Sequence, residues 1–214
     1  MAELTKSEQM FEKLCAARRI PFRRIPTSTL KSADYRLRLG GRTIVVEIKQ
    51  LDPNADDQCL AKAWGTSNCP LASAPANRVQ GLLKDGYKQI KNSAAGKAPA
   101  IIVVHNNAGD WNWIDAFTVS KAMFGSFGFV IGLDTNNVVR LLSHGYLGRR
   151  KVTANTFRSL SAVGVLTEGS ITLYHNPFAI NPMPSTIARR LAAAQYMHPD
   201  PHARGFVPWK PSRN

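Results

Sequence analysis

Two charged side chains, Glu47 and Lys49, interrupt an apolar segment that reads TIVVEIK from Thr43 to Lys49. The β-branched residues around them predict a strand that is buried on both faces. Residues two apart on a strand point to the same face, so we expect the carboxylate and the ammonium group to lie together. Burial of either charge alone would be costly, and an ion pair is therefore the simplest interpretation.

A second carboxylate, Asp34, is brought to the same place by a predicted hairpin. Apolar residues alternate with arginines from Tyr35 to Leu39 and are followed by Gly40-Gly41, the pattern of two strands joined by a two-residue turn with positive φ. In that hairpin Asp34 lies near Glu47 and Ile48. Three charged groups are thus expected at one end of the sheet.

Two adjacent carboxylates suit Mg²⁺, which binds a few carboxylates together with waters and phosphate oxygens. Such a metal lowers the pKa of its bound water and neutralises charge on a phosphoryl group, while a neighbouring lysine can orient or deprotonate the water. Phosphodiester hydrolysis is the chemistry that this set of residues predicts.

The pattern Asp34-x12-Glu47-Ile48-Lys49 resembles the PD-(D/E)XK motif of the restriction-endonuclease-like nucleases. Those proteins carry Asp at the start of a hairpin and ExK on the central strand. The resemblance covers about residues 7–105, and Ala33 stands where the name of the motif has proline. It implies an α/β fold with a restriction-endonuclease-like core, in which a central mixed β-sheet is flanked by α-helices.

The same resemblance implies a Mg²⁺-dependent nuclease, with Mn²⁺ as a substitute and DNA rather than RNA as substrate. Asp34 and Glu47 would hold the metal, with the backbone carbonyl of Ile48 as a further ligand, and Lys49 would position the attacking water. From the flanking helices, the resemblance adds Glu8 as a metal-site residue, with Glu12 as the second choice. It also adds Gln89 as a catalytic residue. A surface position is as good an interpretation of Glu8, and a better one of Gln89.

Apolar spacing predicts the elements that would position these residues. We expect helices over 7–19, capped by Ser7, and over 78–92, and a strand over 100–105. The Pro- and Asn-containing segment 51–77 reads as a long insertion without strong periodicity.

The second half of the chain carries weaker patterns. Strands are expected over 129–133, 138–142 and 171–174, and helices over 119–124 and 185–197, the last capped by Ser185. Residues 153–166 faintly resemble a helix-turn-helix segment. We expect one domain over 1–197 and a disordered basic, Pro-rich tail over 198–214.

The chain of 214 residues has 28 Lys and Arg against 14 Asp and Glu, a formal net charge of +14. This excess favours a polyanion such as nucleic acid, although a basic surface without a specific ligand is an equal alternative on charge alone. The basic residues expected to contact nucleic acid are Lys84, Lys88, Arg149, Arg150 and Lys151. A non-catalytic nucleic-acid-binding or protein-interaction module on the same fold is the alternative function.

Three cysteines without paired spacing indicate neither a disulfide framework nor a zinc module, which favours a reducing cytoplasm. No apolar stretch approaches the ~20 residues of a membrane-spanning helix, so we expect no membrane partner. The sequence leaves the oligomeric state open.

Overall fold

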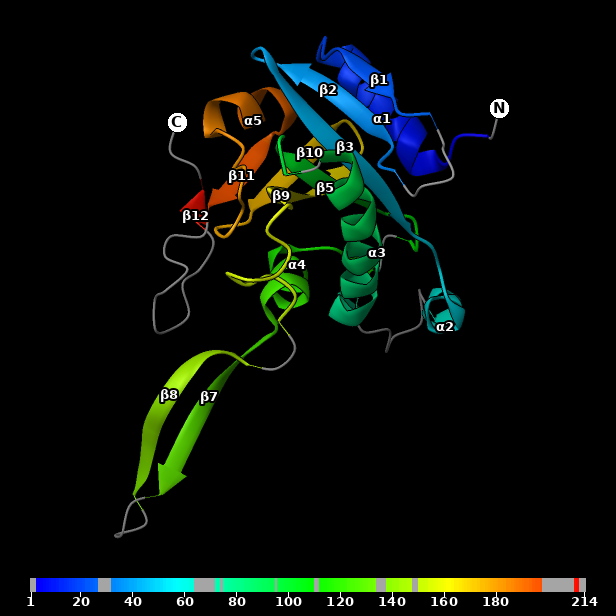
Figure 1. The fold of residues 1–214 in the computed structure, drawn as a ribbon. Helices are drawn as coiled ribbons and strands as arrows, with labels where there is room; N and C mark the ends of the chain where they lie inside the picture. The colour runs from blue at the N-terminus through cyan, green and yellow to red at the C-terminus, as the bar shows by residue number, and fades with distance from the viewer. Residues whose placement is uncertain are drawn as a thin grey trace.

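A computed structural model of the chain describes residues 3–26, 32–63, 72–73, 75–94, 96–109, 112–133, 138–147, 150–197 and 210–211. The helices are α1 (Lys6–Ala17), α2 (Ala55–Ala63), α3 (Ala76–Ala94), α4 (Ala116–Phe124) and α5 (Ser185–Leu191). The strands are β1 (Phe22–Arg24), β2 (Tyr35–Leu39), β3 (Arg42–Leu51), β4 (Ala72–Ser73), β5 (Ala100–Asn106), β6 (Asn112–Trp113), β7 (Ser126–Leu133), β8 (Val139–Leu147), β9 (Ala162–Thr167), β10 (Ser170–His175), β11 (Ala194–Met197) and β12 (Lys210–Pro211). The expected α/β class, with a large mixed sheet between helices, is confirmed (Figure 1).

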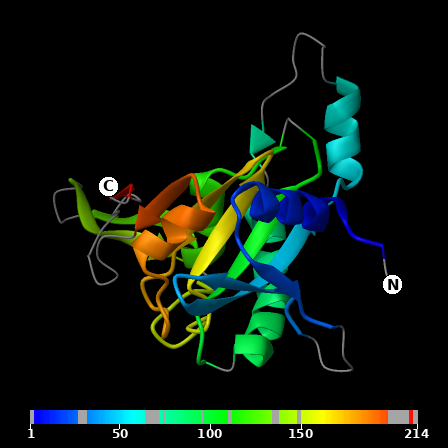
Figure 2. The same ribbon diagram turned by 90° about the horizontal axis from the view of Figure 1, so that it is seen from above.

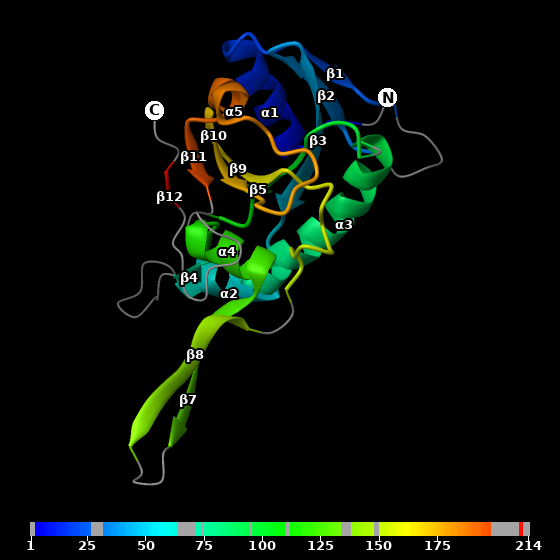
Figure 3. The ribbon, with the colours of Figure 1, turned by 60° about the vertical axis from the view of Figure 1, so that its left-hand side comes forward.

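The central sheet has the strand order β1-β2-β3-β5-β9-β10-β11-β12. β3, β5 and β9 run parallel to one another, whereas β1, β2 and β10 pair antiparallel with their neighbours β2, β3 and β9. Helices α1 and α5 cover one face of this sheet, and α3 and α4 cover the other (Figure 3). Because β3 and β5 are buried on both sides, their sequences are apolar at nearly every position.

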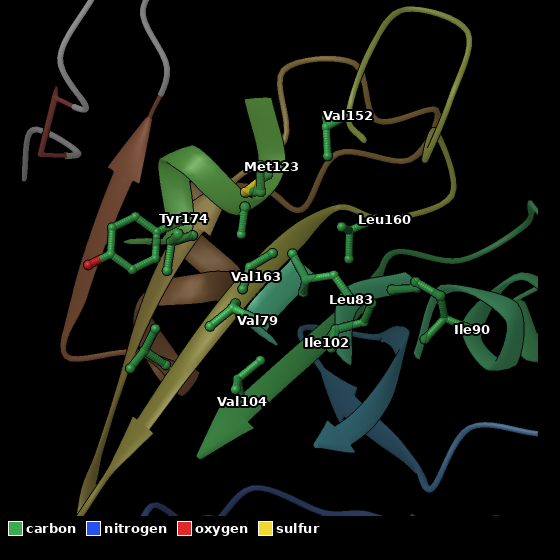
Figure 4. Packing of buried hydrophobic residues seen from close by; sticks show 14 of the residues in the cluster. Val79, Leu83, Ile90, Ile102, Val104, Met123, Val152, Leu160, Val163 and Tyr174 are labelled. Carbon is green, nitrogen blue, oxygen red and sulfur yellow. The ribbon is translucent and has the colours of Figure 1, made fainter. Parts of the chain in front are cut away.

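Alternating residues of the central strands enter two hydrophobic clusters. Ile102 and Val104 of β5 pack with Leu83 and Ile90 of α3, as Figure 4 shows. The intervening residues, such as Val103, pack toward α1 and α5 on the other face. Glu47 falls in the register that faces α3, so its carboxylate lies in the same layer as the first cluster.

The predicted hairpin is confirmed as β2 and β3. Gly40 and Gly41 adopt φ values of 54° and 74°, a region that side chains rarely occupy, which explains glycine at both positions. The predicted first helix is also confirmed, but its N-cap is Thr5 and not Ser7. Ser7 lies buried inside the first turn, where its N–H donates to Gln50 Oε1 at 3.1 Å.

Three expectations for the irregular segments are wrong. The segment 51–77 contains α2, which an ion pair between Asp57 and Arg78 at 2.7 Å ties to α3. Residues 162–166 of the supposed helix-turn-helix segment belong to strand β9. The final helix ends at Leu191, because residues 194–197 form β11 against β10. Its N-cap is Pro184 and not Ser185, and no side chain caps it.

The tail lies mostly outside the described residues, which include 210–211 of it. Those two residues form β12, which pairs antiparallel with β11, and the disorder of the tail stays a prediction. Figure 2 shows the arrangement from above, with α2 on the side of the molecule away from the β7–β8 hairpin. No helix in the described part of the chain is long and apolar enough to cross a membrane.

Candidate functional site

The backbone of the hairpin places the Asp34 side chain beside β3. Tyr35 pairs with Val46, and the Asp34 N–H donates to the Val46 carbonyl at 3.1 Å, so Asp34 stands directly across from Glu47. Asp34 Oδ2 then accepts a hydrogen bond from the Ile48 N–H at 2.7 Å. The predicted position of Asp34 near Glu47 and Ile48 is confirmed.

Lys49 connects the strand to α3. Its Nζ lies 2.6 Å from Glu47 Oε1 and donates to Gln89 Oε1 at 2.7 Å. The other end of the Gln89 amide donates to the Ser32 carbonyl at 3.2 Å, which fixes the orientation of the amide. The structure therefore brings Asp34, Glu47 and Lys49 together, as the hairpin pattern predicts, and places Gln89 beside them, where the family resemblance puts it.

Gly86 lets α3 approach the strand at this point. A Cβ atom on Gly86 would meet Glu47 Cγ at 3.3 Å and Ile102 Cδ1 at 3.2 Å, tighter than ordinary van der Waals contact. Glycine lowers helix propensity, and its presence inside a 19-residue helix is explained by this close approach. The glycine thus helps to bury the Glu47 side chain.

Burial dominates the electrostatics of the two carboxyl groups. Glu47 is 1% exposed, and desolvation together with the negative charge of Asp34 raises the pKa of Glu47 to about 8, although Lys49 opposes the shift. Desolvation also raises the pKa of Asp34, and the charge of Glu8 adds to the shift, while the hydrogen bond from Ile48 opposes it. Glu47 Oε2 accepts no hydrogen bond from any described residue.

These features fit a divalent cation. Two carboxyl groups meet at one site beside a single lysine, and Glu47 Oε2 has no hydrogen-bond partner among the described residues. The Ile48 N–H points to the side of β3 on which Asp34 lies, next to the start of β2. The N–H and C=O of one strand residue point to the same side, so the Ile48 carbonyl also lies on the Asp34 side. Mg²⁺ keeps several waters and needs few protein ligands. Within the described ranges, no three His, Cys, Asp or Glu side chains form a metal-binding group.

Glu8 has partners for both carboxylate oxygens. Its Oε2 closes a capping box with the N–H and hydroxyl of Thr5, and its Oε1 pairs with Arg24 at 3.0 Å. A metal-site role for Glu8, which stays a prediction, would require release from Arg24. Glu12, the second choice, accepts a hydrogen bond from the Tyr35 hydroxyl at 2.9 Å.

The predicted nucleic-acid contacts lie on two segments. Lys84 and Lys88 are exposed on α3, the helix that carries Gln89, and Lys88 forms a surface ion pair with Asp85 at 3.3 Å. Arg150 is exposed and Lys151 partly buried, just beyond strand β8, and Arg149 lies outside the described residues. Their contact with nucleic acid stays a prediction.

Sequence reasoning missed the supporting residues. Ser93 Oγ accepts a hydrogen bond from the Ala33 N–H at 2.7 Å, and the Ser32 carbonyl binds Gln89, so α3 holds the segment that leads into Asp34. Gly86, Gln89 and Ser93 are spaced three and four apart, and this spacing marks one face of a helix. That signal was present in the sequence.

Comparisons with models of protein families, with curated proteins and with solved structures find no match to this chain.

Proposed function

We propose that the chain is a metal-dependent nuclease that hydrolyses phosphodiester bonds, with DNA rather than RNA as substrate, on a restriction-endonuclease-like core. The observation that carries the proposal is the pairing of buried Glu47 with partly buried Asp34 beside Lys49. A purely structural ion pair requires one acid and one base. Here burial raises the pKa of the Glu47 carboxyl and the charge of a second acid, Asp34, raises it further, an arrangement that does not serve stability and is typical of functional sites.

Each residue of the site has its own role in the proposed reaction. Asp34 and Glu47 would hold Mg²⁺ or Mn²⁺, with the Ile48 carbonyl as a further ligand. When bound, the ion lowers the pKa of a coordinated water and neutralises charge on the phosphoryl group. Lys49 has three N–H donors, of which Glu47 and Gln89 engage two among the described residues, so the third would orient a water or a phosphate oxygen.

Access and charge support a nucleic-acid substrate. The Lys49 side chain is 20% exposed and Asp34 is partly buried, so the site reaches solvent although Glu47 is buried. Exposed Lys84 and Lys88 lie on the same helix as Gln89, and the chain carries a net charge of +14. Neutralisation of phosphates by such lysines releases counterions and favours binding.

The test is a gel assay of supercoiled, linear and branched DNA, and of RNA, with Mg²⁺ or Mn²⁺. Wild type is compared with Lys49→Ala and with Lys121→Ala, which removes an exposed lysine from α4. We expect wild type and Lys121→Ala to cut DNA and Lys49→Ala to leave it intact. If every protein shifts DNA in the gel and none cuts it, the non-catalytic binding module replaces the nuclease.

A further inference from the structure

Strands β7 and β8 form a separate two-stranded sheet that projects from the body as an arm (Figure 1, Figure 3). The arm is anchored at its base, where the Tyr146 ring packs on Phe124 with 5.5 Å between ring centroids and the Tyr146 hydroxyl lies 2.9 Å from Ser120 Oγ. A lone two-stranded ribbon is marginally stable in water. The outer part of the arm therefore needs a partner that its own chain does not provide among the described residues.

One face of the described outer arm, residues 131–133 and 139–141, carries only aliphatic side chains. Ile131 pairs with Leu141 and Leu133 with Val139, and directly paired residues of antiparallel strands share a face. These four side chains are 54–68% exposed, and none belongs to either hydrophobic cluster of the described residues. Such an unpartnered aliphatic face marks an interaction site.

The opposite face is less uniform. Gly132 pairs with Arg140, and the Leu142 side chain covers the glycine, because a Cβ there would meet Leu142 Cδ1 at 2.8 Å. Val130 and Leu142 add further exposed apolar area on the arm. The aliphatic face is thus the side on which a partner would pack.

Charge argues against nucleic acid as the partner of this arm. Arg140 is the one Lys, Arg, Asp or Glu in the sequences of β7 and β8, although the whole chain carries +14. A surface that binds phosphate would need several cations. The chemistry of the arm instead fits another aliphatic surface of similar shape.

Area and charge together favour a second copy of this chain. The four exposed side chains of the aliphatic face present on the order of 400 Å² of apolar surface, close to the apolar share, roughly 60%, of the ~800 Å² that each partner buries in a standard interface. Two copies with a charge of +14 repel each other. An arm of eight residues reaches roughly 25 Å, beyond the ~10 Å Debye length at 0.1 M salt, so contact through the arms keeps the charged bodies apart.

We propose that the β7–β8 arm is a dimerisation surface, which packs its aliphatic face against the same face of a second copy of this chain. The contact is isologous, because each copy contributes the same four side chains about a two-fold axis. The proposal is independent of nuclease activity.

The test is sedimentation of the full chain by analytical ultracentrifugation over a range of concentrations. We expect wild type to be a dimer and the double variant Ile131→Asp, Leu141→Asp to be a monomer at the same concentrations. The matched control, Ile180→Asp, places an acid at another exposed isoleucine outside the arm and leaves the dimer intact. Circular dichroism verifies that all three proteins keep the folded body.

A second measurement locates the contact. In a chain with Cys59→Ser and Cys69→Ser, Leu133→Cys is treated with a short bismaleimide cross-linker, and we expect a covalent dimer that Ile180→Cys does not give. A wild-type monomer at all concentrations, a dimer that survives the double aspartate variant, or an arm that binds phospholipid vesicles while the protein stays monomeric would each overturn the proposal.

Discussion

At the scale of single residues, the pKa of Glu47 links protonation to stability. Burial and Asp34 raise this pKa from 4.5 to about 8, so the folded state keeps a proton that the unfolded state releases. The resulting stabilisation is complete below about pH 4.5 and is lost as the pH rises through about 8. Without metal, we therefore expect the free energy of unfolding to fall between about pH 5 and pH 8, as measured by urea denaturation with a chelator.

Glu47→Gln should remove most of this pH dependence and leave the variant more stable than wild type near pH 8. The control, Glu168→Gln, changes an exposed glutamate and should keep the wild-type slope. Equal slopes for wild type and Glu47→Gln would show that the Glu47 carboxylate is not the group that titrates.

A divalent cation should reverse the loss of stability near pH 8. Since metal binding competes with the proton and favours the folded state, Mg²⁺ or Mn²⁺ should raise the melting temperature of wild type. Glu47→Gln and Asp34→Asn should show no such rise. An increase of the same size in both variants would place the metal elsewhere on the chain.

Gln89 acts on the proposed reaction through Lys49, whose Nζ it holds at 2.7 Å. Gln89→Ala should therefore reduce the rate of DNA cleavage by ~10–100-fold, the usual effect of removing a group that orients a catalytic one. Loss of Lys49 itself should cost ~10²–10⁴-fold. Gln80→Ala, on the same helix, is the control and should cleave at the wild-type rate. If Gln89→Ala cleaves DNA as fast as Gln80→Ala, Gln89 is an ordinary surface residue without a role in the reaction.

At the scale of elements, two glycines in α3 have opposite roles. Nothing lies within 4 Å of a Cβ at Gly81, so Gly81→Ala should raise the free energy of unfolding by ~0.4–1 kcal/mol. At Gly86 the same change crowds Glu47 and Ile102, so α3 must move away from β3 and the gain in helix propensity is lost. Chemical denaturation of both variants compares them directly. A gain at Gly86 as large as that at Gly81 would mean that the close contact between helix and strand is easily relaxed.

The hairpin and the cluster around Glu47 were predictable because local rules determine them. Period-2 alternation places Glu47 and Lys49 on one face, and Gly40-Gly41 sets the register that brings Asp34 opposite. The β11 strand was not predictable. The alanine run 192–194 that leads into it favours a helix, and parallel pairing with β10, in which Ala194 lies opposite Thr172, overrides that preference. The spacing that places Gln89 beside Lys49 was visible, but the sequence alone does not show which helix face meets which strand.

At the scale of the whole molecule, the charge of +14 gives the two proposed interactions opposite responses to salt. Salt screens the repulsion between two bodies, so dimerisation through the neutral aliphatic arm faces should strengthen or stay constant as salt rises. DNA binding should weaken as salt rises, because each neutralised phosphate releases a counterion. Each such contact makes the slope of log K against the logarithm of the salt concentration more negative by ~0.9. Sedimentation and fluorescence anisotropy of a labelled duplex, both without metal, measure the two trends on one preparation.

Variants of the α3 lysines test whether the salt dependence of DNA binding arises from phosphate contacts on α3 or from the net charge of the protein. Replacement of Lys84 and Lys88 by alanine should reduce the magnitude of the salt slope by ~2 if both contact phosphates. The charge-matched control replaces exposed Lys13 and Lys62 of α1 and α2, and it should keep the wild-type slope. Because the two double variants carry the same net charge, equal slopes would exclude α3 as the DNA-binding surface. A smaller slope for the α3 variant alone places the phosphates beside Gln89 and the Lys49 ammonium group, where cleavage is proposed.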